Sequence, residues 1–310
     1  MRHPAGPARL GFGAFHGDEL GLAFLTRRRF LQVTAGLAGA AVLTEGAILE
    51  PNYPRIVRLE IPLARLPEAF DGFTIVQLSD FHYDRYLSAH IIRAAVDMAN
   101  QLRPDLMVLT GDFVTLDPLP DLLDIRRSTA LDADPCAQLL TPLRAPAGRF
   151  CVLGNHDVSS DAHLVTEILN FYELPVLNNR ALAIERSGAR LWIAGMDDYL
   201  NGEGDLELAL RGIPAGEPVV LLEHEPDVAK HTINYPVDLQ LSGHSHGGQV
   251  WFPGFGALWL PPLARKYPRG LYQLGPLTLY TNIGLGTIRV PIRLNCPPEV
   301  THFTLRAKKM

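Results

Sequence analysis

Five short polar motifs contain the residues of this chain that are suited to chemistry. They are Asp80-Phe81-His82, Gly111-Asp112, Gly154-Asn155-His156-Asp157, His224 and Gly243-His244-Ser245-His246. Four of them follow a short apolar run typical of a buried strand, and His224 comes just after a fifth such run. Residues at the carboxyl ends of strands in parallel or mixed sheets gather at one edge, so we expect the five motifs to converge on one pocket.

The side chains in these motifs are typical ligands of divalent cations. The seven candidate ligands are Asp80, His82, Asp112, Asn155, His224, His244 and His246. Carboxylate, amide oxygen and imidazole without thiolate suit a hard or borderline cation. Seven ligands are too many for one site but suit two ions that share a bridging carboxylate. We take Asp112, in the middle of the set, as the candidate for this bridge. Two such ions would lower the pKa of a water between them and hold both reacting oxygens of a phosphoryl group.

Two residues of the third motif remain for proton transfer. We predict that His156 donates a proton to the leaving group and that Asp157 orients its ring. Each motif alone has a simpler interpretation, since Asp80 would also suit a turn and His224 would also suit a buried core. The joint pattern favours chemistry, because five of the eleven histidines lie in these motifs.

Taken in order, the motifs resemble the calcineurin-like metallophosphoesterase superfamily from Phe73 to about Gln249. The resemblance implies a four-layer α/β/β/α sandwich with two mixed β-sheets and a centre of two divalent ions, for which manganese, iron and zinc are all suitable. It implies that one ion binds Asp80, His82, Asp112 and His246, and the other binds Asp112, Asn155, His224 and His244. His156 matches the catalytic histidine of the family.

The C-terminal part resembles a narrower, bacterial exported or membrane-associated branch. The matching segments are 243–250, 266–270 and 291–300. That branch includes cell-envelope phosphodiesterases and hydrolases of UDP-2,3-diacylglucosamine, a lipid A precursor. We therefore predict cleavage of a phosphodiester or pyrophosphate bond by a metal-bridging hydroxide, on a cell-envelope or lipid-linked substrate. The alternatives are a phosphomonoesterase, a non-catalytic metal-stabilised binding protein of the envelope, and a purely structural envelope protein.

The bulk composition limits the other classes of function. The 310 residues carry a formal net charge of -5 and have a pI near 6.1, so no basic face for nucleic acid is expected. The three cysteines, Cys136, Cys151 and Cys296, have no Cys-x-x-Cys spacing, which argues against a thiolate zinc site. A single disulfide among them is left open by the sequence.

The first 50 residues read as a twin-arginine-type signal and linker, and residues 51–310 as the catalytic domain. Thr26-Arg27-Arg28-Arg29-Phe30-Leu31-Gln32 precedes a mildly apolar stretch over Val33–Leu43. This pattern predicts export by the Tat machinery to a periplasmic or extracytoplasmic location. The apolar stretch is shorter than the roughly 20 residues of a spanning helix, so we expect at most a membrane tether. The alternative is an ordinary buried helix.

The remaining pattern predicts α/β layers around two sheets. Strands are expected at 57–61 (a half-buried edge strand), 73–78, 106–109, 150–153, 181–185, 191–194, 219–222 and 239–241, with several more as far as Leu305. Helices are expected over 91–99 after a cap at Ser88, near 136–140, over 162–170 and briefly from Asp227. The first strand, helix, strand unit implies a right-handed crossover if its two strands are parallel.

Clues to the substrate are less specific. Val250–Leu260 carries four aromatic residues directly after the last histidines, and either forms an apolar lip for acyl chains or the bilayer, or packs into the core. Arg265, Lys266 and Arg269 are candidates to contact a second phosphate, or are solvated surface charges. Glu223 and Glu225 flank His224 and either support this ligand or change the metal preference.

Overall fold

The computed structural model describes residues 27–116 and 129–308 and divides the chain into two compact units, Met1–Val42 and Leu43–Met310. The larger unit begins before the predicted boundary at residue 51. Its first residues are tied to its C-terminal part, because the Gly46 carbonyl accepts the Arg293 N–H at 2.8 Å. The Glu50 carboxylate accepts the N–H groups of Asn295 and Cys296.

The N-terminal helix is longer than the apolar stretch that the sequence indicates. Helix α1 covers Arg27–Thr44, every residue of it is exposed, and a π-turn over Glu45–Leu49 and a 3-10 turn over Glu50–Asn52 extend it. The segment Arg27–Asn52 is long and apolar enough to cross a membrane by length and composition. The helix continues past Leu43 and is longer than the apolar stretch on which the expectation of a mere tether was based, and that expectation stays a prediction. A buried helix, the alternative, is not observed, whereas a signal sequence would have the same properties.

The first sheet has five strands in the order β1-β13-β2-β3-β4. The strands are β1 (Arg55–Leu63), β13 (Glu299–Ala307), β2 (Thr74–Leu78), β3 (Leu106–Thr110) and β4 (Arg149–Val152). The central strands β2, β3 and β4 are parallel, whereas β13 is antiparallel to β2 and parallel to β1. Strand β1 lies at the sheet edge, as predicted, and pairing with β13 joins it to the C-terminal end of the chain.

The second sheet has six strands in the order β11-β12-β8-β7-β6-β5. The strands are β11 (Gly270–Leu274), β12 (Leu277–Thr281), β8 (Leu239–Ser242), β7 (Val219–Leu222), β6 (Ala189–Gly195) and β5 (Arg180–Arg186). The four inner strands are parallel, and both edge strands are antiparallel to their neighbours. A separate small hairpin joins β9 (Trp251–Phe252) to β10 (Gly256–Ala257).

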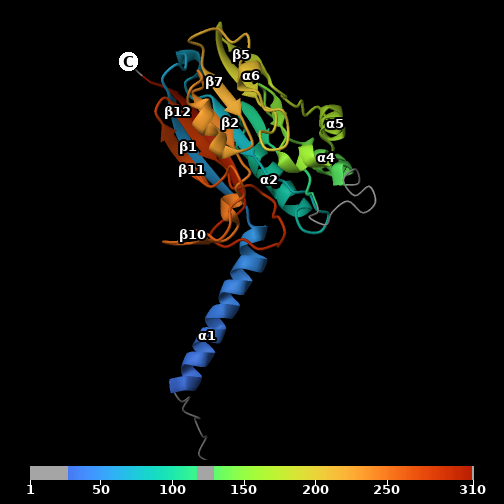
Figure 1. Ribbon diagram of the computed structural model, residues 1–310, viewed down its shortest axis with the longest axis vertical. Helices are drawn as coiled ribbons and strands as arrows, with labels where there is room; N and C mark the ends of the chain where they lie inside the picture. The colour runs from blue at the N-terminus through green and yellow to red at the C-terminus, as the bar shows by residue number, and fades with distance from the viewer. Residues whose placement is uncertain (1–26, 117–128, 309–310) are drawn as a thin grey trace, which may run out of the picture. The chain divides into compact units, whose positions relative to one another are not determined.

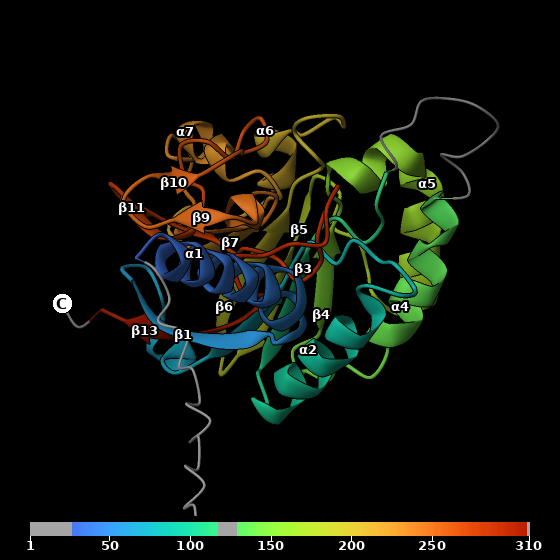
Figure 2. The same cartoon turned by 90° about the horizontal axis from the view of Figure 1, so that it is seen from below.

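Alternation along the strands produces two apolar layers on the first sheet. Leu106 and Val108 of β3 face the second sheet and pack with Ile193 and Val220, whereas Met107 and Leu109 face outward. The outward layer is covered by α2 (Ala89–Gln101), α4 (Ala133–Leu140) and α5 (Asn155–Phe171). Figures 1 and 2 show these helices together on one side of the larger unit, and Figure 2 shows them beside β3 and β4.

The outer face of the second sheet has a thinner helical layer. It consists of the short helices α6 (Leu206–Ala209) and α7 (Ala229–Thr232) and the 3-10 turn over Pro226–Val228. These pack on outward residues such as Val219 and Leu277. The predicted four-layer α/β/β/α arrangement with two mixed sheets is therefore confirmed.

Several local predictions need correction. Helix α5 begins at Asn155, not 162; a break at Asp161 (φ -168°, ψ 92°) separates a first turn from the predicted helix. Ser88 precedes α2 as predicted, but its hydroxyl donates to the His82 carbonyl and makes no capping bond. The short helix expected from Asp227 is present as the 3-10 turn over Pro226–Val228 and α7, and the Asp227 carboxylate accepts N–H groups from residues 265–267.

The helix expected near 136–140 is confirmed as α4, and residues 117–128 lie outside the described part of the chain. All three cysteines are free and buried, so the disulfide that the sequence left open is not formed.

Replacement of Phe303 by alanine should lower the free energy of unfolding by about 3–5 kcal/mol. Phe303 is fully buried between the sheets and contacts Tyr280 edge to face, with ring centroids 5.1 Å apart. Denaturant unfolding of the purified protein measures this change. Phe171→Ala is the matched control, because Phe171 is 80% exposed and should cost about 1 kcal/mol or less. Equal costs for the two variants would contradict an inter-sheet core at Phe303.

Candidate metal centre

The five motifs meet where strands of both sheets end. Asp80 and Asp112 follow β2 and β3 of the first sheet, and His224 and His244 follow β7 and β8 of the second. The backbone fixes the first two motifs to each other, because Asp80 N–H donates to the Gly111 carbonyl at 3.0 Å. The sequence prediction that these strand ends converge is therefore confirmed.

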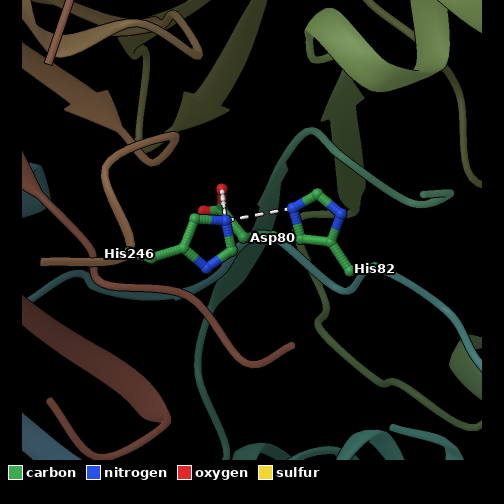
Figure 3. Close-up of side chains that lie close together, drawn as sticks. All are labelled: Asp80, His82 and His246. Atoms are coloured by element: carbon green, nitrogen blue, oxygen red, sulfur yellow. Dashed lines mark hydrogen bonds and ion pairs between the residues drawn. The ribbon is translucent and has the colours of Figure 1, made fainter. Parts of the chain in front are cut away.

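One group of candidate ligands contains Asp80, His82 and His246 (Figure 3). The Nε2 atoms of the two histidines lie 3.0 Å apart, and His246 Nε2 lies 3.3 Å from Asp80 Oδ1. The Nδ1 atom of His82 is 3.2 Å from the Thr115 hydroxyl, which fixes the ring. The three side chains thus direct nitrogen and oxygen atoms at one small volume.

A second group contains Asp112, His224 and His244. His224 Nδ1 lies 2.6 Å from the Thr110 carbonyl, and its Nε2 lies 3.2 Å from Asp112 Oδ2. His244 Nε2 lies 2.8 Å from the Pro262 carbonyl, so the neutral ring keeps its lone pair on Nδ1. Backbone carbonyls therefore select the tautomers in this group, as they commonly do for metal-binding histidines.

Asp112 lies between the two groups. The same atom, Oδ2, is 3.2 Å from His224 Nε2 and 3.4 Å from His82 Nε2. The other oxygen accepts the His156 N–H at 2.9 Å, which holds the carboxylate in this orientation. Asp112 is thus placed to serve both groups, the position that the sequence predicts for a bridging ligand.

An unpaired polar atom indicates that the residues fit divalent cations. Asn155 Oδ1 is buried and has no hydrogen-bond partner among the described residues. A buried polar atom without a partner costs about 1–3 kcal/mol, which a bound cation would offset. The donor set of carboxylate, amide and imidazole groups without thiolate is also suited to such ions. Asn155 would complete the second group.

The backbone around the two groups is strained and closely packed. Five candidate ligands have left-handed φ angles, which non-glycine residues rarely adopt: Asp80 (52°), His82 (40°), Asp112 (55°), His244 (68°) and His246 (51°). A Cβ added at Gly154 would lie 2.4 Å from Asp112 Oδ1, and one at Gly243 would lie 2.4 Å from Asp80 Oδ2. Such strain concentrates at functional sites, and these two glycines leave room for the carboxylates.

The electrostatics favour ionised Asp112 and neutral His244. Burial would raise the pKa of Asp112, but His224 and His156 lower it well below its usual value. Burial lowers the pKa of His244 to about 3. Burial opposes the charged form of His224 too, yet Asp112 raises the pKa of this imidazole well above its usual value. A cation at His224 would therefore have to displace a proton.

His156 and Asp157 lie in the first turn of α5. His156 Nδ1 accepts the Leu116 N–H at 2.9 Å, so the neutral ring carries its proton on Nε2. Burial lowers the pKa of His156 to about 4, which keeps the ring neutral at pH 7.

Asp157 does not orient the ring of His156, contrary to the prediction. Its Oδ2 accepts the Gly154 N–H at 3.0 Å, and its Oδ1 accepts the N–H groups of Phe113 and Val114 at 2.8 and 3.1 Å. The carboxylate thus connects the start of α5 to the loop after Asp112. It positions the two motifs, and the N–H of Leu116 holds the ring of His156 instead.

A cavity of about 290 Å³ lies over these residues. Its lining is Asp112, Thr115, Leu116, Asn155, His156, Leu200, His244, His246, Trp259, Pro261, Pro262, Ile288 and Arg289. Arg289 was not among the predicted site residues, because it lies far along the chain from the five polar motifs. Its guanidinium stacks over the Trp259 ring, 4.6 Å from the centroid. The predicted cations Arg265, Lys266 and Arg269 are not in this lining.

The glutamates beside His224 do not hold its ring. Thr110 has that role, while Glu225 accepts the Tyr199 N–H at 3.2 Å. Both glutamates are fully buried, and burial raises the pKa of Glu223 to about 8.

The profile of calcineurin-like phosphoesterases matches residues 73–248, which covers all five motifs. The chain belongs to this family. Its fold, its candidate ligands and its relatives identify a metallophosphoesterase, a hydrolase of phosphoesters, and members of the family use two divalent metal ions.

Three relatives are similar over most of their length. The uncharacterized metallophosphoesterase YkuE of Bacillus subtilis is 35% identical, over 91% of this chain and 98% of the relative. The phosphodiesterase YaeI of Escherichia coli is 32% identical, over 91% of this chain and 99% of the relative. The UDP-2,3-diacylglucosamine pyrophosphatase LpxG of Chlamydia trachomatis is 28% identical, over 81% of this chain and 89% of the relative.

Replacement of Asp112 by asparagine should remove at least one of the two metal ions per chain. The amide has only one oxygen and no charge, so it cannot serve both groups of ligands. Elemental analysis of the purified protein after dialysis measures the metal content. Asp97→Asn, at an exposed position on α2, should retain the wild-type content. Wild-type metal content in a correctly folded Asp112→Asn protein would show that Asp112 is not a shared ligand.

Proposed function

We propose that this metallophosphoesterase cleaves a phosphodiester or pyrophosphate bond in a cell-envelope or lipid-linked substrate such as UDP-2,3-diacylglucosamine. The observation that carries the proposal is the composition of the cavity wall. Beside the candidate ligands His244 and His246, it combines one cation, Arg289, with apolar residues such as Trp259 and Ile288. The names of the relatives YaeI and LpxG, a phosphodiesterase and a pyrophosphatase, support the same chemistry.

The candidate ligands fall into two sets that share one carboxylate. One ion would bind Asp80, His82, Asp112 and His246, and the other would bind Asp112, Asn155, His224 and His244. When bound, two ions supply Lewis acidity, which lowers the pKa of water and stabilises the charge of the phosphoryl group. Manganese, iron and zinc all suit these donors.

His156 is the residue that we assign to proton transfer. Its Nδ1 is engaged by Leu116, so Nε2–H is the donor that remains for an oxygen of the substrate. Transfer of a proton to the leaving oxygen would start from the imidazolium form of His156 and leave the neutral ring, whereas the neutral ring would stabilise the developing alkoxide by an Nε2–H hydrogen bond.

Arg289 is suited to the second charged group of the substrate. A pyrophosphate substrate carries a second phosphoryl group beyond the scissile bond, and the guanidinium lies at the cavity wall where this group would pass. Phosphomonoesters and simple phosphodiesters lack a second phosphate, so the position of Arg289 favours the pyrophosphate.

We further propose that residues 1–50 direct export by the Tat machinery and that residues 51–310 act as the catalytic domain outside the cytoplasm. The three arginines Arg27, Arg28 and Arg29 begin the exposed helix α1 and are followed by its apolar residues, which is compatible with export or membrane association. Secretion of the full-length chain, compared with a variant in which these arginines are replaced by lysine, would test this part of the proposal.

His156→Gln should lower kcat for a chromogenic phosphodiester by about 10²- to 10⁴-fold, the usual contribution of a general acid or base. The assay compares this diester with the matching monoester, with and without added Mn²⁺, and measures the metal content in parallel. The control is His163→Gln, an exposed histidine in the same helix α5, which should keep full activity.

Each outcome of this assay selects one interpretation. Full diester activity in His156→Gln, with full metal content, would contradict the assigned role of His156. Faster cleavage of the monoester by the wild type would favour a phosphomonoesterase. Stoichiometric metal without hydrolysis of either ester or of a lipid-linked pyrophosphate would favour a binding protein.

A further inference from the structure

Three segments that are distant in the sequence lie side by side within the larger unit. They are the turns over Glu45–Asn52, the strap over residues 286–296 and the hairpin over residues 250–258. The strap connects the other two, because Arg293 N–H donates to the Gly46 carbonyl and Trp251 N–H donates to the Leu294 carbonyl at 2.9 Å. The residues that directly continue the N-terminal helix are thus bonded to the same strap as the hairpin.

The hairpin, Trp259 directly after it, and the strap present large apolar side chains to solvent. Their exposed fractions are 94% for Phe255, 72% for Leu258, 52% for Val290, 43% for Trp259 and 39% for Phe252. We call these five residues the apolar rim. Exposed apolar residues grouped on neighbouring segments mark an interaction surface. The core-packing alternative for this aromatic segment is therefore wrong for these side chains.

Two arginines stack on the two tryptophans of this region. Arg269 lies over the ring of Trp251 and Arg289 over the ring of Trp259, each 4.6 Å from the centroid. Tryptophan is enriched at the interface between membrane and water, and arginine is attracted to anionic lipid headgroups. The combination of apolar rim and stacked arginines therefore has the chemistry of a bilayer surface.

A narrow apolar groove connects the apolar rim to the candidate metal centre. Its lining is Ser245, His246, Gly248, Gln249, Val250, Leu258, Trp259, Ile288, Arg289 and Val290. Four of these residues, namely His246, Trp259, Ile288 and Arg289, also line the cavity over the metal centre. A chain that entered at the rim would thus have its polar end near His246.

We propose that the apolar rim rests in the headgroup region of a lipid bilayer and that the groove admits an acyl chain of the substrate. A bilayer is a better candidate for this contact than a second copy of the chain, because the strap is bonded to the segment that is suited to crossing a membrane. The segment Arg27–Asn52 is suited to crossing a membrane, and its last turns are bonded to the strap that carries Val290. The acyl-chain part rests on the lipid-linked substrate of the proposed function, whereas contact of the rim with the bilayer does not.

Quenching of tryptophan fluorescence in the reconstituted full-length protein tests the bilayer contact. The variant Trp192→Phe leaves Trp251 and Trp259 as the only tryptophans of the chain. In vesicles of lipids brominated on the acyl chains, its emission should fall by at least twofold relative to unbrominated vesicles. The matched control, Trp251→Phe with Trp259→Phe, keeps only Trp192 on β6 and should not be quenched. Unquenched emission from the first variant would overturn the proposal.

A kinetic comparison tests the function of the contact. Phe255→Ser should leave the rate on a soluble chromogenic diester unchanged, because Phe255 lines neither the cavity nor the groove. On a lipid-anchored diester in vesicles, the rate should fall by about tenfold, the loss expected for one aromatic side chain at the interface. The control Phe171→Ser, at a phenylalanine of α5 that is 80% exposed, should change neither rate.

The possible failures are distinguishable. If no diester is cleaved, the proposed function fails, while the quenching result still decides the contact with the bilayer. Equal rates of Phe255→Ser and the wild type on vesicles would overturn a role of the rim in catalysis at membranes. An oligomer that dissociates in Phe255→Ser, together with unquenched tryptophans, would assign the apolar rim to a second copy of the chain.

Discussion

The structure around the candidate centre depends on the placement of one carboxylate, Asp112, between two groups of imidazoles. One oxygen of Asp112 is within 3.4 Å of a ring nitrogen from each group, and the other is held by the N–H of His156. A buried carboxylate is costly unless it is paired. The histidines around this carboxylate come from both sheets and are far apart in the sequence. The site therefore requires that the two sheets pack against each other in one fixed orientation.

The packing between the sheets supplies this relation. The side chains between them are almost all apolar, and the buried amide of Gln77 adds hydrogen bonds to Thr110 on one sheet and to the Ser242 carbonyl on the other. The strand ends therefore cannot shift independently. The strained backbone at five candidate ligands is retained because this packing, together with the hydrogen bonds of Asp157, leaves the loops little freedom.

The C-terminal third of the chain connects this centre to the surface. Arg293 is fully buried and donates to the carbonyls of Ile283, Gly286 and Cys296, which fixes the strap beside His246. The strap in turn carries Arg289 and Val290 past the cavity and bonds to the residues that follow the N-terminal helix. Arg289 at the cavity wall, Val290 of the apolar rim and the hydrogen bond to Gly46 are thus located on one continuous segment.

The sequence by itself determined the two-sheet fold, the seven candidate ligands and His156, because each motif follows an apolar strand whose period and position are local properties. It did not determine what depends on contacts between distant segments. Asp157 binds three backbone N–H groups and not the ring of His156, because the loop after Asp112 folds over the start of α5. Arg289 reaches the cavity only because the strap crosses it, and no local pattern marks that path. The exposure of Phe255 was likewise decided by tertiary structure, since an aromatic run has the same sequence whether it packs inside or faces a membrane.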